Sequence, residues 1–126
     1  MPHYLVCNYL PDNFDPSTVT EAMVDEIHAL NREMDAAGIT KFACGITPAV
    51  LAKTVRKKSD GTVIVTDGPF TEAKEHMGGF WILEVANMEE ALKWARRGAI
   101  FGEAVGEVRE LLFFPAPEQA SNATTE

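Results

Sequence analysis

Six short runs of this sequence have the pattern of apolar and polar positions that is typical of β-strands. In a strand, successive side chains lie on opposite faces of the sheet, so the pattern has a period of two. The runs at 80–85 and 107–114 are apolar on both faces, which indicates that both sides of this part of the sheet are covered. The expected strands cover residues 3–10, 39–46, 51–58, 62–66, 80–85 and 107–114.

Two further segments repeat apolar residues at helical spacing. The first has a capping-box pattern at Thr18 and Glu21 and ends at Gly38, and the second runs from Asn87 to Gly98. The apolar stripe of the first helix comprises Val19, Met23, Ile27, Leu30, Met34 and Ala37. The order β-α-β, hairpin, β-α-β predicts an α+β fold, the ferredoxin-like split βαβ arrangement with an inserted β-hairpin.

Two helices cover only one face of such a sheet. The other face is still apolar, so we expect a homodimer in which two open sheet faces pack together. One domain is expected over residues 1–114. The tail at 115–126 is polar and without periodicity, and we expect it to be disordered.

The composition of the chain limits the classes of partner and the cell compartment that we expect for it. The 126 residues carry a net charge of −8, which argues against a nucleic-acid partner because phosphate binding relies on clustered Lys and Arg. The N-terminus does not resemble a secretory leader, and no apolar run approaches the roughly 20 residues of a membrane helix. We therefore expect a cytoplasmic protein that binds no membrane. Cys7 and Cys44 are expected to be buried free thiols, and no metal site or cofactor is indicated.

The stretch DGPFTEAKEHMGG, at 67–79, gathers ionisable side chains between two apolar runs. Gly68 and Pro69 are expected to break the incoming strand, and Thr71 to cap a short helical turn. The ionisable residues are Asp67, Glu72, Lys74, Glu75 and His76. The motif TDGPFTEAKE followed by GGFW resembles the signature of the DGPF-domain proteins, a branch of the YCII-related family.

This resemblance extends from residue 3 to about residue 114 and implies the same ferredoxin-like fold, assembled as a dimeric α/β barrel. Genes for DGPF-type proteins often lie beside genes for extracytoplasmic-function sigma factors. The resemblance therefore permits a regulatory role and implies no particular reaction.

Asp67 is the first candidate for chemistry, since it leaves a strand beside a rigid Gly-Pro turn. A carboxylate at Asp67 or Glu72 that Phe70 and Trp81 desolvate can act as a general acid or base. The alternative is structural: Asp67 accepts N–H groups of the turn, and Phe70 is a hydrophobic peg.

The second candidate is His76. On a helical turn Glu72 and His76 face the same side and form a carboxylate-oriented imidazole, or else an exposed pair without a catalytic role. Lys74, the adjacent Glu75 and Phe70 are candidates for ligand binding, and solvation is the alternative for Lys74.

His28 and Arg109 are two further ligand-binding candidates. YCII-related proteins outside the DGPF branch carry a His on the first helix that has been suggested as catalytic. In this sequence Ile27, not His28, stands at the matching distance from Gly38, so the alternative is an ordinary polar-face histidine. Arg109 can clamp a ligand or form an interface salt bridge.

Three functions remain open from the sequence alone. The chain can bind a small molecule near the central motif and catalyse acid–base chemistry on it. It can bind the same molecule without chemistry, as a sensor or carrier. It can instead be a regulatory or protein-interaction module, one that acts with an extracytoplasmic-function sigma factor. Convergent ionisable groups in a cavity favour the first function, and an exposed apolar patch favours the third.

Overall fold

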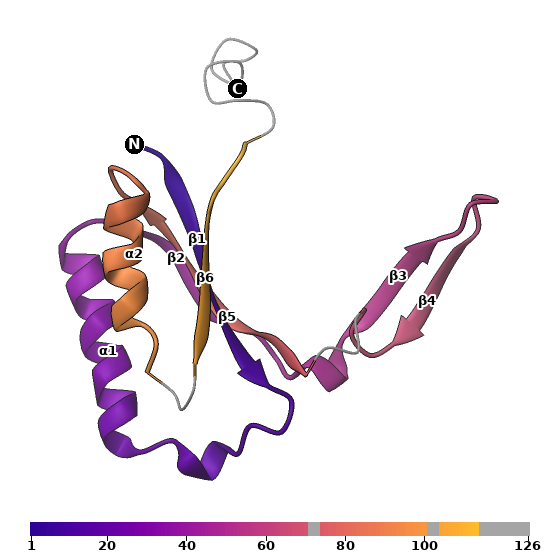
Figure 1. The fold of residues 1–126 in the computed structure, drawn as a ribbon, viewed down its shortest axis with the longest axis horizontal. Coiled ribbons are helices and arrows are strands. Elements are labelled where there is room, and N and C mark those ends of the chain that lie inside the picture. The colour runs from indigo at the N-terminus through magenta and orange to yellow at the C-terminus, as the bar shows by residue number, and fades with distance from the viewer. Residues whose placement is uncertain (71–73, 101–103, 114–126) are drawn as a thin grey trace.

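A computed structural model describes residues 1–70, 74–100 and 104–113. Four strands form an antiparallel sheet in the order β2-β5-β1-β6, while β3 and β4 form a separate two-stranded sheet. Both helices lie on one face of the larger sheet (Figure 1). This α+β architecture is compatible with the expected ferredoxin-like fold. The elements are β1 (His3–Pro11), η1 (Pro16–Thr18), α1 (Glu21–Ala36), β2 (Thr40–Gly45), η2 (Ala49–Leu51), β3 (Lys53–Lys57), β4 (Val63–Asp67), β5 (Glu75–Glu84), α2 (Met88–Arg97) and β6 (Val105–Glu110).

Helix α1 begins later than the sequence predicted. Thr20, not Thr18, is the N-cap, and its hydroxyl oxygen accepts a hydrogen bond from the N–H of Met23 at 3.1 Å. Thr18 instead ends the 3-10 helix η1, and its hydroxyl donates to the carbonyl of Asp15 at 2.7 Å. The predicted cap was wrong because Asp15 and Pro16 start a turn of their own, with Pro at its first position.

Helix α2 is confirmed as predicted. The side chain of Asn87 accepts a hydrogen bond from the N–H of Glu90 at 2.9 Å, and Gly98 follows the last turn. Acidic residues lie in the first turn and Arg96 and Arg97 in the last, which suits the helix dipole. Within the described residues, neither helix is long and apolar enough to cross a lipid bilayer.

The core lies between the helices and the sheet, with Trp81 in it. The indole N–H of Trp81 donates to Oδ1 of Asn31 on α1 at 2.8 Å, which gives the ring's one polar atom a partner. A Cβ on Gly98 would lie 2.8 Å from the Trp81 ring, so the absence of a side chain there lets α2 approach the sheet closely. The buried core residues are Tyr4, Val6, Leu30, Met34, Trp81, Leu83, Val85 and Ala91.

On its other side, the sheet carries a second apolar surface. We call this the open sheet face and define it by Leu5, Cys7, Phe42, Phe80 and Ile82, which the register places side by side. Phe42 is exposed, and its ring centroid lies 6.0 Å from that of Phe80. No partner chain is present, so the expected homodimer stays a prediction.

Strands β5 and β6 differ from the predicted boundaries. β5 begins at Glu75 rather than at Phe80, because cross-strand pairing with β1 continues to Pro11 and carries Gly78 and Gly79 with it. Long-range pairing thus overrides the weak strand preference of glycine. β6 runs from Val105 to Glu110, so it begins before residue 107, and residues 111–113 are not part of a strand, contrary to the prediction. Residue 114 and the tail at 115–126 fall outside the described residues.

The predicted hairpin is confirmed, and we call residues 53–67 the arm. Lys58 and Thr62 close its turn through a backbone hydrogen bond of 2.7 Å, and Gly61 supplies the positive φ of +91° that was expected there. β3 starts at Lys53 rather than at residue 51, because Ala49–Leu51 form the 3-10 helix η2. The arm projects from the sheet on the side opposite to the helices (Figure 1).

Candidate functional site

The side chains of His76 and Asp12 contact each other near the end of β1 and the start of β5. The register places His76 opposite Leu10, and the N–H of Asp12 donates to the carbonyl of Lys74 at 2.7 Å. These backbone bonds hold both residues at the same end of the two central strands. Nδ1 of His76 lies 2.6 Å from Oδ1 of Asp12, and the His76 side chain is only 18% exposed. Asp12 thereby fixes the orientation of the imidazole.

A β-bulge sets the face on which His76 lies. The register shifts between Asn8 and Tyr9, which pair with Gly79 and Met77 and leave Gly78 as the extra residue. One extra residue reverses the side to which all preceding side chains of the strand point. His76 therefore shares a face with Leu10, while the flanking residues of β5 share the other face with Tyr9.

The His76–Asp12 pair borders a cavity of about 520 Å³. We call it the proline cavity because Pro11, Pro16, Pro48 and Pro69 line it. His76 and Asp12 supply all the titratable groups among its described lining residues. Apart from Thr47 and Gly78, the other lining residues are apolar: Leu10, Phe14, Ile46, Ala49, Val50 and Met77. A polar pair at the edge of an apolar cavity is typical of a ligand site.

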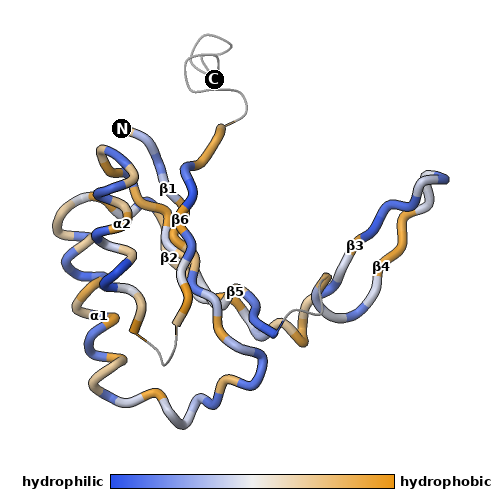
Figure 2. The backbone as a smooth tube through the Cα atoms, in the orientation of Figure 1, coloured by the Kyte–Doolittle hydropathy of each residue, from blue (hydrophilic) through white to orange (hydrophobic). Residues whose placement is uncertain are grey.

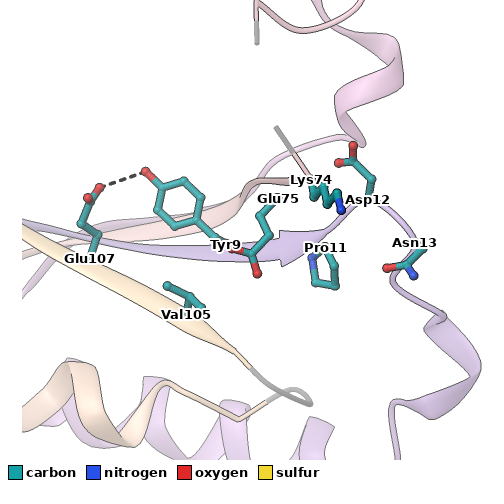
Figure 3. A pocket seen from close by; sticks show the side chains of 8 residues that line it. All are labelled: Tyr9, Pro11, Asp12, Asn13, Lys74, Glu75, Val105 and Glu107. Carbon is teal, nitrogen blue, oxygen red and sulfur yellow. Dashed lines mark hydrogen bonds between the residues drawn. The ribbon is translucent and has the colours of Figure 1, made fainter. Parts of the chain in front are cut away.

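A second depression lies on the other side of Asp12. This acidic groove is open, has a volume of about 930 Å³ and is lined by Tyr9, Pro11, Asp12, Asn13, Lys74, Glu75, Val105 and Glu107 (Figure 3). The hydroxyl of Tyr9 donates to Oε1 of Glu107 at 3.0 Å. This hydrogen bond raises the pKa of Tyr9, because the phenolate could not donate it, and burial and the Glu107 charge add to the increase.

The structure places Lys74 and Glu75 beside Asp12, as ligand-binding candidates near the pair. It does not bring Asp67 there. Asp67 ends β4, forms an ion pair with Lys53, and has a side chain that is 86% exposed. The idea that Phe70 and Trp81 desolvate it is wrong, because Phe70 is exposed beneath Arg56 and Trp81 is in the core.

The helical turn proposed for the central motif is not formed at His76. His76 belongs to β5, and among the described residues its carboxylate partner is Asp12 from across the sheet. Glu72 and the predicted cap Thr71 lie outside the described residues.

His28 and Arg109 are placed away from the pair. His28 is exposed on α1, and Arg109 lies on β6 opposite Leu5. Neither lines the proline cavity, the acidic groove or a smaller hollow of about 300 Å³ bordered by α1 and the sheet. Their proposed contacts with a ligand stay predictions.

The cysteines differ from each other. Cys7 is buried, as expected, but Cys44 is exposed, so the prediction of two buried thiols was wrong for Cys44. Cys44 lies in β2, an outer strand of the sheet, and β5 pairs with it on one side. Burial raises the pKa of the Cys7 thiol, as does the Glu107 charge, and Arg109 opposes both effects.

Sequence reasoning missed Asp12, which lies just after the strand expected at residues 3–10. A signal was available: in a split βαβ sheet the first and third main strands are antiparallel neighbours. The end of the first strand therefore lies beside the start of the strand that follows the central motif.

Among the described residues, no three His, Cys, Asp or Glu side chains gather closely enough to hold a metal ion.

Comparison with known proteins relates almost the whole chain to one family. A family model described as the YCII-related domain matches residues 1–115. The chain is also 34% identical over 103 residues to "Uncharacterized protein R00369" of Rhizobium meliloti (strain 1021), an alignment that covers 80% of this chain and 82% of the relative.

Proposed function

This chain belongs to the YCII-related domain family, and we propose that it binds a small molecule in the proline cavity and transfers a proton to or from it through His76. The observation that carries the proposal is the 2.6 Å contact between His76 and Asp12 at the edge of that cavity. The cavity volume of about 520 Å³ falls within the range of roughly 300–1,000 Å³ that is common for ligand sites.

Each residue of the pair has a distinct role in this proposal. Asp12 orients the imidazole, and His76 accepts or donates the proton that is transferred. The apolar walls hold the body of the ligand and exclude water from the reacting groups. Lys74, next to Asp12 in the acidic groove, binds an anionic group of the ligand.

We further propose that the functional unit is a homodimer formed through the open sheet face. Leu5, Phe42, Phe80 and Ile82 give this face an apolar surface that a second copy can cover. Phe42 is exposed in the single chain, and aromatic side chains are enriched at protein interfaces.

A thermal-shift screen of small metabolites tests the ligand site. A ligand that binds only the folded state raises the melting temperature, and the increase grows with the logarithm of the ligand concentration divided by its dissociation constant. We expect ligands that stabilise the wild type to bind His76→Gln and Asp12→Ala at least about tenfold more weakly, which corresponds to roughly 1.4 kcal/mol. His28→Gln is the matched control, because His28 is exposed on α1 and should leave affinity unchanged. Equal affinities of all four proteins would contradict the proposal.

The alternative function is a non-catalytic regulatory or protein-interaction module, including one that acts with an extracytoplasmic-function sigma factor. The exposed apolar side chains of the arm favour it. A screen without ligands, together with a specific protein partner whose binding depends on the arm, would favour this function over catalysis.

A further inference from the structure

The arm is a two-stranded sheet of its own. β3 and β4 pair with each other and not with the strands of the larger sheet. Such a hairpin is at best marginally stable in water unless something packs against it. We therefore expect another surface to pack against the arm. The two faces of the arm differ in how apolar and how exposed they are.

One face of the arm is apolar and exposed. The register places Val55 opposite Val65, and Lys57 opposite Val63, all on this face. Val55, Val63 and Val65 are 67%, 57% and 64% exposed. We call these three residues the valine face. Contiguous exposed valines on a projecting hairpin mark a surface for another protein.

The opposite face already has contacts within its own chain. The hydroxyl of Thr54 donates to the carbonyl of Gly68 at 2.7 Å, and the guanidinium of Arg56 lies 5.2 Å from the centroid of the Phe70 ring. These contacts anchor the base of the arm and shield part of this face. The valine face is thus the one presented for a partner.

Charge indicates what that partner is. Residues 53–67 contain four basic and two acidic side chains, a charge of +2, whereas the whole sequence carries −8 and so leaves −10 on the rest of the chain. A basic arm complements the acidic remainder of another copy, while two arms would repel each other. Arg56, Lys57 and Lys58 place basic charge at or near the tip of the arm.

The arm also lies where a second copy would be. It projects on the side of the open sheet face, as Figure 1 shows, and Figure 2 shows apolar segments along β4. The acidic groove is on the same side, because Glu107 lies opposite Cys7 of the open sheet face and accepts the hydrogen bond from the Tyr9 hydroxyl. The carboxylates among the described residues of this groove are those of Asp12, Glu75 and Glu107 (Figure 3).

We propose that the arm packs against a second copy of this chain. Its valine face contacts that copy, and its basic tip lies at that copy's acidic groove. The inference rests on the proposed homodimer and deepens it. The partner's arm then contributes Lys57 and Lys58 beside Asp12, so each ligand site is completed by both chains.

Sedimentation of matched variants tests the valine face. Val65→Asp and Thr66→Asp add the same charge to adjacent positions on opposite faces of β4. We expect Val65→Asp to raise the dimer dissociation constant at least tenfold and Thr66→Asp to leave it nearly unchanged. Equal effects of the two variants would overturn the inference. A dimer that Phe42→Asp disrupts and Val65→Asp does not would overturn the arm contact while leaving the open-face dimer intact.

Zero-length cross-linking of the wild-type chain tests the tip and needs no variant. A mixture of ¹⁴N- and ¹⁵N-labelled protein is treated with a carbodiimide, which joins amines to carboxylates, and the cross-linked peptides are analysed by mass spectrometry. We expect mixed-label peptides that join Lys57 or Lys58 to Asp12, Glu75 or Glu107. Cross-links of these lysines only within one label, or a wild-type protein that is monomeric at micromolar concentration, would overturn the inference. Ligand binding at His76 is measured separately, so its failure is distinguishable.

Discussion

Nδ1 of His76 and Oδ1 of Asp12 lie 2.6 Å apart although 64 residues separate them along the chain. Antiparallel pairing of β1 and β5 brings them together, and the bulge at Gly78 determines which face His76 occupies. The pair thus depends on the fold as a whole rather than on a local motif. This explains why the stretch at 67–79, which is continuous in sequence, contains His76 but not Asp12.

The pair predicts the tautomer of His76. Because Nδ1 faces a carboxylate, it carries a proton in the wild type, whereas a free imidazole in water prefers the proton on Nε2. We expect the ¹⁵N spectrum of neutral His76 to report a protonated Nδ1. Asp12→Ala should move this proton toward Nε2, and His28 in the same sample is the internal control. An unprotonated Nδ1 in the wild type would contradict the assigned role of Asp12.

A second prediction concerns acid stability. Arg97 donates two hydrogen bonds to Glu33, at 2.8 and 2.6 Å, and these bonds lower the pKa of Glu33 below its ordinary value of 4.5. A carboxyl with a lowered pKa in the folded state stabilises the protein above the unfolded pKa, and the contribution disappears as the pH falls through the folded pKa.

The measurement is the melting temperature as a function of pH. We expect Arg97→Gln to melt below the wild type at neutral pH, with a difference that shrinks as the pH falls below about 4.5. Arg96→Gln, on the same last turn of α2, is the control. A difference that is constant with pH would assign the effect of Arg97 to its contact with the Trp94 ring instead.

A third prediction is that a side chain at position 79 destabilises the sheet. A Cβ at this position would lie 2.9 Å from the carbonyl oxygen of Cys44, a backbone atom of the neighbouring strand that cannot move aside alone. We expect Gly79→Ala to lower the free energy of unfolding by about 1–3 kcal/mol. Gly45→Ala is the control, since its nearest neighbour would be 3.8 Å away, at ordinary contact distance. Urea unfolding that gives equal losses for both variants would refute the steric explanation.

Thiol reactivity gives a fourth prediction. Cys44 is exposed, whereas Cys7 is buried and has a raised pKa, which keeps it in the unreactive thiol form. Iodoacetamide at neutral pH should therefore modify Cys44 well before Cys7. Mass spectrometry of the wild type and Cys44→Ser checks the order. Faster modification of Cys7 would mean that its strand opens to solvent.

Local patterns were sufficient for most of the fold. The stripe that includes Leu30 and Met34 located α1, Asn87 and Gly98 bounded α2, and Gly61 marked the turn of the arm. Errors came where a local signal competed with a tertiary one. The capping-box pattern at Thr18 and Glu21 placed the start of α1 too early, because Asp15 and Pro16 begin a separate 3-10 helix there.

The candidate site was predictable only in part, for the same reason. The sequence singled out His76 because ionisable residues cluster around it, but Asp12 becomes its neighbour only through strand pairing. Asp67 was favoured for its position beside a Gly-Pro turn, yet it is the last residue of the arm, where its side chain is exposed and paired with Lys53. Solvent exposure depends on how the hairpin is placed, which local spacing does not encode.

The most direct test of a ligand site at His76 uses the histidine side chains themselves. The chain contains three histidines, His3, His28 and His76, so each imidazole signal can be assigned by one substitution. ¹⁵N-histidine-labelled protein is titrated with the ligands that a thermal-shift screen selects. We predict that the His76 signals move and saturate with ligand, that His28 stays fixed, and that Asp12→Ala weakens the response. Ligands that bind while the His76 signals do not change would contradict the proposed site.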